Sequence, residues 1–458
     1  MQTDFTFLLP FLLTLTGMTL FAIRKGAAQS AADFAVAGRT AGKWSVAGAI
    51  MGTLVGGAST IGTAQLAFLF GLSAWWFTLG AGLACLFLGL FLASPLQRGA
   101  VETIPQFIAR YHGDRARTWA SAFSSLGMFI HIVAQLLACC ALLSSLFGLS
   151  LFHAALIAAL LVALVTLRGG MRSAGPVGLI KLLLLYCTMI GAGSLAFTKA
   201  GGLSELSSHF EPFPWFSLFG YGVQEGLSDL LSMLVGVVST QIYLQAIFSA
   251  RSPQTARQGA LLSALLIPPM GLFGIAVGLY MRQTQPELDS VLALPAFLLQ
   301  NLPPLLAGPA FAVLLFAAVG TASGLTLGVG TTLQVDLLAR FSQGTDKRLQ
   351  HLRLTTFAVL AVAMGLVLAN LGSAIMQWSF LSMGLRGATL ALPLLAAVFW
   401  GERTSRRGGA LAILLGPSSA ILVGLTGWPE WPPLYVGLAV ALGCLLLGKV
   451  STLKNFPA

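Results

Sequence analysis

The sequence predicts an all-α membrane protein that crosses the bilayer many times. Of its 458 residues, 57% are hydrophobic and 9% are charged, whereas a soluble domain carries about 25% charged residues. Apolar runs near the ~20 residues that a helix needs to cross a bilayer recur along the whole chain. The net charge of +11 is therefore expected to reflect basic cytoplasmic loops, and no nucleic-acid partner is expected.

Hydropathy along the chain predicts thirteen spans. The first is expected to be retained, because Asp4 stands where a signal peptide carries positive charge. The longest segment between spans, 199–225, is expected to be an external loop. The spans lie near 5–23, 44–70, 74–96, 118–146, 152–167, 176–198, 226–250, 259–281, 308–337, 354–370, 374–400, 408–427 and 433–448.

The distribution of Lys and Arg predicts the orientation of these spans. Of the 25 basic residues, 21 fall in alternate loops and in the C-terminal tail, and only Lys199 and Arg282 fall in the other loops. Because loops rich in Lys and Arg stay in the cytoplasm, the N-terminus is expected outside and the C-terminus inside. The remaining two basic residues, Lys181 and Arg386, lie within spans.

One glycine-rich stretch, GAIMGTLVGGASTIG (Gly48–Gly62), stands inside the second span. Gly48, Gly52 and Gly56 recur every four residues, which favours a close helix-packing seam. The Gly56-Gly57 pair also favours unwinding, which is tolerated within a membrane where the backbone lines a cavity or a site. Secondary transporters use such broken helices to bind ions and substrates. The stretch is therefore either a packing seam or the broken helix of a transporter.

Five segments, taken in order and spacing, resemble the sodium:solute symporter family. Each is weak alone, and together they cover nearly the whole chain. They are DFAVAGRTAGKW (Asp33–Trp44), ETIPQFIARYHG (Glu102–Gly113), TLRGGMRSAGP (Thr166–Pro176), STQIYLQAIFSARSPQTARQGA (Ser239–Ala260) and ALPAFLLQNLPPLLAGPAFAVLLFAAVGTASG (Ala293–Gly324), followed by an acidic match at Asp336.

The resemblance implies the LeuT-type fold, in which five core helices are repeated in inverted orientation. The implied parts are an extra N-terminal helix and a cytoplasmic loop, the first core repeat, the external loop, the second core repeat and two C-terminal helices. Their ranges are 1–43, 44–198, 199–225, 226–400 and 401–458.

The resemblance also implies a principal sodium site between the first and eighth core helices. Its backbone carbonyls align with Gly52, Val55 and Ala317, and its two hydroxyl positions align with Gly320 and Thr321. Glycine has no hydroxyl, so one oxygen ligand is lost unless water or a nearby serine, Ser323, replaces it.

A second departure from the family concerns the fifth core helix. Where the family has an acid and, three residues later, a glutamine, this chain has Gly178 and Lys181. The acid supports a second sodium site in some members, so that site is not expected here. Lys181 either extends its amine to water at the cytoplasmic end or replaces the cation, as a lysine does in some proton-coupled relatives of the fold.

Arg386 is the main candidate for substrate binding. It lies about midway through the tenth core helix, where a charge is costly and usually faces a cavity. The planar guanidinium suits a carboxylate substrate. Pairing with Asp229, or with a set of backbone carbonyls, is the alternative.

Four further polar residues are candidate substrate contacts. His131 and Gln135 lie four residues apart and share one helix face. An interhelical hydrogen bond is the alternative role for His131. Ser59 and Thr60 follow the glycine pair. By contrast, Ser239–Gln241 is expected to serve packing and the cytoplasmic gate.

The resulting prediction is a multi-pass cell-membrane symporter that imports a small organic solute, a carboxylate, by alternating access coupled to the sodium gradient. The alternative within this fold is proton-coupled or sodium-independent transport through Lys181. A membrane sensor is the alternative of another class, and a fused sensor is disfavoured because the chain ends just after its last span. No cofactor is expected beyond the coupling ion, sodium or a proton. An enzyme is not expected, since no metal-ligand cluster, nucleophile–base pair or phosphate loop appears.

Overall fold

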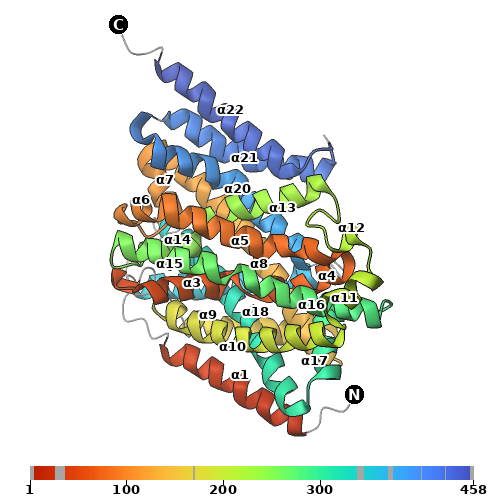
Figure 1. The fold of residues 1–458 in the computed structure, drawn as a ribbon. Helices are drawn as coiled ribbons and strands as arrows, with labels where there is room; N and C mark the ends of the chain where they lie inside the picture. Colours follow the sequence, from red (N-terminus) through yellow and green to blue (C-terminus); the bar gives the residue numbers. More distant parts are fainter. Residues whose placement is uncertain are drawn as a thin grey trace.

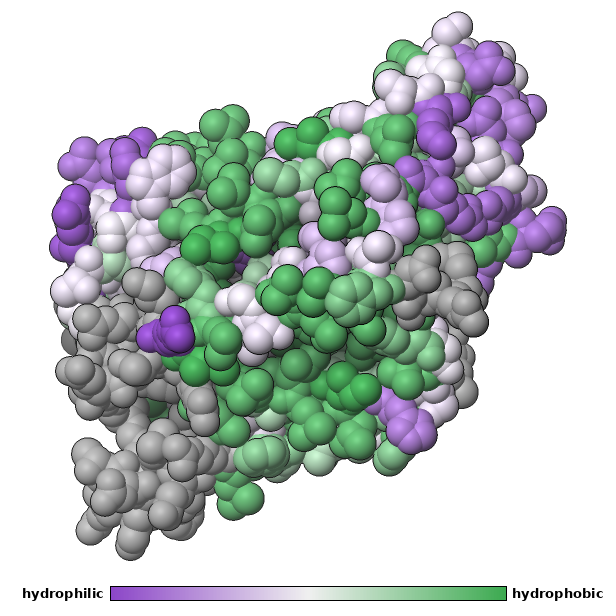
Figure 2. Space-filling model, turned by 90° about the horizontal axis from the view of Figure 1, so that it is seen from below, coloured by the Kyte–Doolittle hydropathy of each residue, from purple (hydrophilic) through white to green (hydrophobic). Residues whose placement is uncertain are grey.

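The computed structural model describes residues 5–25, 37–168, 171–337, 345–369, 375–403, 405–428 and 430–453. The regular elements in these ranges are helices, as the sequence predicted. Most of them run side by side, with α1 along one edge of the bundle and α21 and α22 along the opposite edge (Figure 1). Figure 2 shows hydrophobic side chains across the middle of one face and hydrophilic ones gathered toward its two ends.

Helices cover all thirteen expected spans within the described residues. Eight helical segments of the described residues are long and apolar enough to cross a membrane, or nine if one bent pair counts as a span. One of the eight, Ala58–Arg98, covers parts of two expected spans, and shorter apolar helices lie in others. The helices of the spans are α1 (Phe5–Lys25), α3 (Lys43–Leu54) with α4 (Thr63–Phe70), α5 (Trp76–Phe87) with α6 (Ala93–Arg98), α8 (Asp114–Phe147), α9 (Leu151–Arg168), α10 (Met171–Lys199), α13 (Val223–Val238) with α14 (Gln241–Phe248), α15 (Pro253–Leu266) with α16 (Pro268–Thr284), α18 (Pro304–Thr332), α19 (Thr345–Ala369), α20 (Ile375–Phe399), α21 (Arg406–Thr426) and α22 (Pro433–Leu453).

Some predicted features lie outside the described residues. These are Asp4, the Asp33–Val36 part of the first family segment, the Gly169–Gly170 turn, and the basic residues Arg340 and Lys454.

The segment predicted as an external loop, 199–225, is partly helical. It contains α11 (Gly202–His209) and α12 (Pro212–Trp215). Pro212 occupies the first turn of α12, where its missing N–H has no intrahelical partner to lose. The segment folds back onto the bundle at Gly71, whose positive φ of 61° and lack of a Cβ let the Trp215 backbone approach closely.

The glycine-rich stretch contains a break, as one of its two interpretations predicted. Helix α3 ends at Leu54, Val55 is extended (φ −91°, ψ 100°), and a π-helical turn resumes at Ala58–Gly62. A Cβ on Gly56 would lie 2.7 Å from Gln135 Oε1. The glycine pair is thus needed because α8 and α18 approach the unwound backbone too closely for any side chain.

The same stretch is also a packing seam, so both interpretations hold for different glycines. Gly48 and Gly52 on α3 pack against Gly175 and Gly178 on α10, and a Cβ on Gly52 would lie 2.6 Å from Gly178 Cα. The seam brings the backbones of α3 and α10 into contact just before the break in the sequence.

We expect Gly178→Ala to lower the melting temperature of the purified protein, because its Cβ would overlap the carbonyl oxygen of Gly48. Overpacking of this kind costs about 1–3 kcal/mol. Gly191→Ala on the same helix is the matched control, since nothing lies within 4 Å of its Cβ position. Equal melting temperatures for the two variants would contradict the close seam.

A second broken helix opens the second half of the core. Helices α13 and α14 meet at an angle of 42°, and Thr240 between them is extended (φ −95°, ψ 119°). Each of the two predicted core repeats, 44–198 and 226–400, therefore has a broken helix near its start, as expected for a five-plus-five inverted repeat.

Candidate functional site

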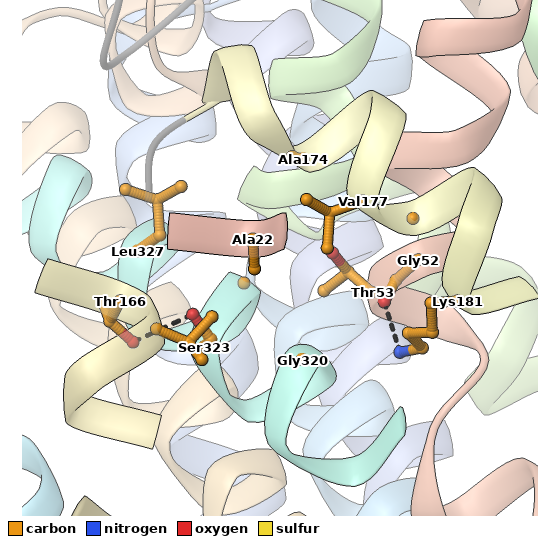
Figure 3. A pocket seen from close by; sticks show the side chains of 13 residues that line it. Ala22, Gly52, Thr53, Thr166, Ala174, Val177, Lys181, Gly320, Ser323 and Leu327 are labelled. Atoms are coloured by element: carbon orange, nitrogen blue, oxygen red, sulfur yellow. Dashed lines mark hydrogen bonds between the residues drawn. The ribbon is translucent and has the colours of Figure 1, made fainter. Parts of the chain in front are cut away.

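The amine of Lys181 lies inside the predicted cation site. Its Nζ donates hydrogen bonds to Gly52 O at 2.6 Å, Ala317 O at 2.8 Å and Thr321 Oγ1 at 3.0 Å. The side chain is 1% exposed. An ammonium group has three donors, and all three are satisfied by oxygens that the family resemblance assigned to sodium. Figure 3 shows the bond to Gly52.

The two remaining predicted ligands, Val55 and Gly320, border the same point. Thr321 Oγ1 donates a 3.5 Å bond to Val55 O, so this carbonyl faces the site. A Cβ on Gly320 would lie 3.6 Å from Lys181 Nζ. The position that carries a hydroxyl in the family therefore faces the lysine amine in this chain.

Ser323 does not replace the missing hydroxyl. Its Oγ accepts a hydrogen bond from Thr166 Oγ1 at 3.0 Å. Because Ser323 lies three residues beyond Gly320, it faces α9 about one helical turn closer to the end of α18.

Arg386 on α20 is fully buried and is held by neutral groups. Nε donates to Ser382 O at 3.1 Å and Nη1 to Thr240 Oγ1 at 2.7 Å. Nη2 donates to Ser382 Oγ at 2.8 Å, to Met383 Sδ at 3.2 Å and to His131 Nδ1 at 3.1 Å. No acidic side chain pairs with it in the part of the chain that the structure describes. The guanidinium charge is thus surrounded by dipoles alone.

The proposed pair with Asp229 is not formed. Asp229 Oδ2 instead accepts a 2.6 Å bond from Tyr221 Oη. The alternative, a set of backbone carbonyls around Arg386, is met only in part, since one partner is a carbonyl and the others are side chains.

His131 and Gln135 each have one polar atom that is hydrogen-bonded and one nitrogen donor that is not. A guanidinium can only donate, so His131 Nδ1 accepts from it and the ring proton of the neutral imidazole sits on Nε2. Gln135 Oε1 accepts from Gly57 N at 2.8 Å, which leaves its amide NH₂ as the free end. Both side chains are fully buried, and neither His131 Nε2 nor Gln135 Nε2 has a partner among the described residues.

Ser59 and Thr60 bond to the backbone of Gly56 at the helix break. Both hydroxyls donate to Gly56 O at 2.9 Å, and Ser59 Oγ accepts from Gly56 N at 2.8 Å. Short polar side chains often bond to nearby backbone in this way. These two residues therefore stabilise the unwound backbone within the site.

Sequence reasoning missed Thr240 and Ser382 as partners of Arg386. Thr240 was expected only to contribute packing and gate polarity. The signal in the sequence was the polar triplet Ser239–Gln241 inside an apolar run. Ser382 lies four residues before Arg386, so it shares a helix face with the guanidinium.

A set of polar contacts lies at the end of the bundle that carries the basic loops. Arg117 on α8 pairs with Asp336 at 2.6 Å, and Thr103 Oγ1 donates to Asp336 at 3.2 Å. Gln241 on α14 accepts from Ile104 N at 2.8 Å and donates to Glu102 O at 3.0 Å. The start of the short helix α7 (Ile104–His112) is thereby bonded to α14 and to the π-helical turn Leu333–Leu337 that follows α18.

Two broken helices with a buried polar site beside the breaks are the arrangement of a secondary transporter. The chain belongs to the sodium:solute symporter family, whose model matches residues 34–416. It is an integral membrane protein.

Three known proteins are similar to this chain. The uncharacterized symporter YwcA of Bacillus subtilis (strain 168) is 25% identical over 413 residues, covering 84% of this chain and 79% of that protein. The sodium/glucose cotransporter of Vibrio parahaemolyticus is 20% identical over 424 residues, covering 84% and 78%. The structure of a Na⁺-coupled sialic acid symporter in a substrate-bound, outward-open state superimposes with a TM-score of 0.81 at 17% identity, covering 100% and 99%.

Proposed function

We propose that this protein is a secondary-active importer of a small organic anion, in which the Lys181 ammonium takes the place of the coupling sodium ion. The three hydrogen bonds from Lys181 Nζ to Gly52, Ala317 and Thr321 carry this proposal. A sodium ion would need the same oxygens, so the two cations exclude each other.

Proton coupling follows from the position of the amine. The charged amine joins α10 to the break in α3 and to α18. Loss of one proton removes a donor and the charge, which weakens the contact between these three helices. Protonation of Lys181 would then favour one arrangement of the helices, and its deprotonation another.

Sodium-coupled symport is the second candidate. It is supported by family membership and by the sodium-coupled relatives. It requires the amine of Lys181 to leave the oxygen cage when sodium binds. Alternating access at the cell membrane is proposed in either case, with the Arg117–Asp336 contact opening toward the cytoplasm.

An anionic solute is supported by the groups around Arg386. A buried cation without an acidic partner is costly in a membrane, and an anion would offset that cost. His131 Nε2 and Gln135 Nε2 supply two further donors that lack acceptors in the described structure. A carboxylate can accept from several donors at once, so this class of solute fits the donor set.

The test is thermal melting of the purified protein across sodium concentration and pH. A ligand that binds only the folded state raises the melting temperature. We expect no sodium-specific stabilisation relative to potassium or choline. We also expect a pH dependence in the wild type, part of which disappears in Lys181→Gln. Sodium-specific stabilisation of the wild type would contradict the lysine proposal and favour the second candidate.

A further inference from the structure

A small cavity lies beside Lys181. Its volume is ≈ 50 Å³, and its lining includes Lys181, Thr53, Thr166, Gly320, Ser323 and Leu327. Figure 3 shows these residues around it, contributed by α3, α9, α10 and α18, with Ala22 of α1 beside them. The residues that hold Arg386, on α8, on α20 and at the break between α13 and α14, do not line it.

The cavity runs toward the end of the bundle that carries the basic loops. On α18 its lining proceeds from Gly320 to Leu327, in the direction of Asp336. On α10 it proceeds from Lys181 back to Ala174, near the start of that helix. The positive-inside rule makes this the cytoplasmic end.

The cavity has the size and polarity of a water site. A bound water needs at least about 10–15 Å³ and two to four polar partners, so roughly three waters fit. The hydroxyls of Thr53, Thr166 and Ser323 and the amine of Lys181 line it. No other lining residue from α1, α3, α9, α10 or α18 is ionisable.

We infer that this cavity binds water and carries protons between Lys181 and the cytoplasm, along a route separate from that of the solute. This inference rests on the proposed role of Lys181. One N–H of the ammonium exchanges its bond to a site oxygen for a bond to a cavity water and gives that water its proton, which leaves a neutral amine and a hydronium ion. The hydronium passes the proton to bulk water, and the reverse transfer recharges the amine.

Cysteine labelling in oriented membrane vesicles tests the route. Ser323→Cys should react with a membrane-impermeant thiosulfonate added at the cytoplasmic face, measured by mass spectrometry of the modified peptide. Thr326→Cys is the matched control, because Thr326 lies on the same helix but does not line the cavity and is 1% exposed. A buried thiol reacts only through transient opening, so Ser323→Cys should react roughly tenfold faster or more.

A second pair of variants tests whether the cavity leads to position 181. Lys181→Cys should react from the same face, and adding Leu327→Trp, which fills the cavity, should slow that reaction roughly tenfold. No reaction of Ser323→Cys from the cytoplasmic face, or equal reaction of Thr326→Cys, would overturn the inference. These readouts do not depend on the charge of Lys181, so they fail separately from the melting experiment.

Discussion

Replacing Lys181 by alanine and Gly320 by serine in one variant should make the stability of the protein depend on sodium. The first change removes the amine that holds three of the cage oxygens. The second restores a hydroxyl at a position whose Cβ would lie 3.6 Å from that amine. The family's complete set of oxygen ligands would then surround an open site.

The size of the effect follows from the unsatisfied oxygens. Removing the amine alone leaves buried acceptors without donors, at a cost of about 1–3 kcal/mol for each such group. Sodium at a hundredfold excess over its dissociation constant returns about 2.7 kcal/mol to the folded state. The melting temperature of the double variant should therefore rise with sodium and not with potassium or choline.

The single variants serve as controls for this result. Gly320→Ser alone keeps the Lys181 amine among the same oxygens, so its melting temperature should not respond to sodium. Lys181→Ala alone should respond weakly, because one ligand is missing. A double variant that ignores sodium would show that the oxygens around Lys181 do not form a cation site.

The location of Lys181 illustrates how far the sequence could be read. The sequence predicted that Lys181 lies within a span and that the helix can break at Gly56-Gly57. It did not decide whether the amine extends to water or occupies the cation site, because that depends on how α10 crosses α3. The contact between Gly52 and Gly178 sets that crossing, and it places Lys181, one turn further along α10, beside the Gly52 carbonyl.

The surroundings of Arg386 show the same limit. The sequence located a costly buried charge, but its partner Thr240 lies 146 residues away, at the break between α13 and α14, and no local pattern links the two. Ser59 and Thr60 are bonded locally instead. Their hydroxyls donate to Gly56 O, and their contact with solute stays a prediction.

Arg386→Ala should abolish binding and uptake of the anionic solute while the protein still folds. The variant loses a buried charge that has no acidic partner in the described structure, and such a charge is costly in a membrane. A carboxylate held by two charge-assisted bonds would lose about 1.5–3 kcal/mol for each. Since 1.4 kcal/mol is about tenfold in affinity, binding should weaken by a hundredfold or more.

A melting screen with small organic acids makes this measurable before the solute is known. Acids that raise the melting temperature of the wild type should have no effect on Arg386→Ala, and the corresponding uncharged amides should have no effect on either protein. Arg386→Lys should keep part of the response, because a lysine keeps the charge but loses the planar pair of donors.

Arg257→Ala is the matched control, because this arginine is exposed on α15 and should respond to the acids like the wild type. A variant lacking Arg386 that is still stabilised by the same acids, or still imports them, would restrict this arginine to a structural role. The donors of His131 and Gln135 would then point to a neutral solute, since they can bind a carbonyl or hydroxyl oxygen as well as a carboxylate.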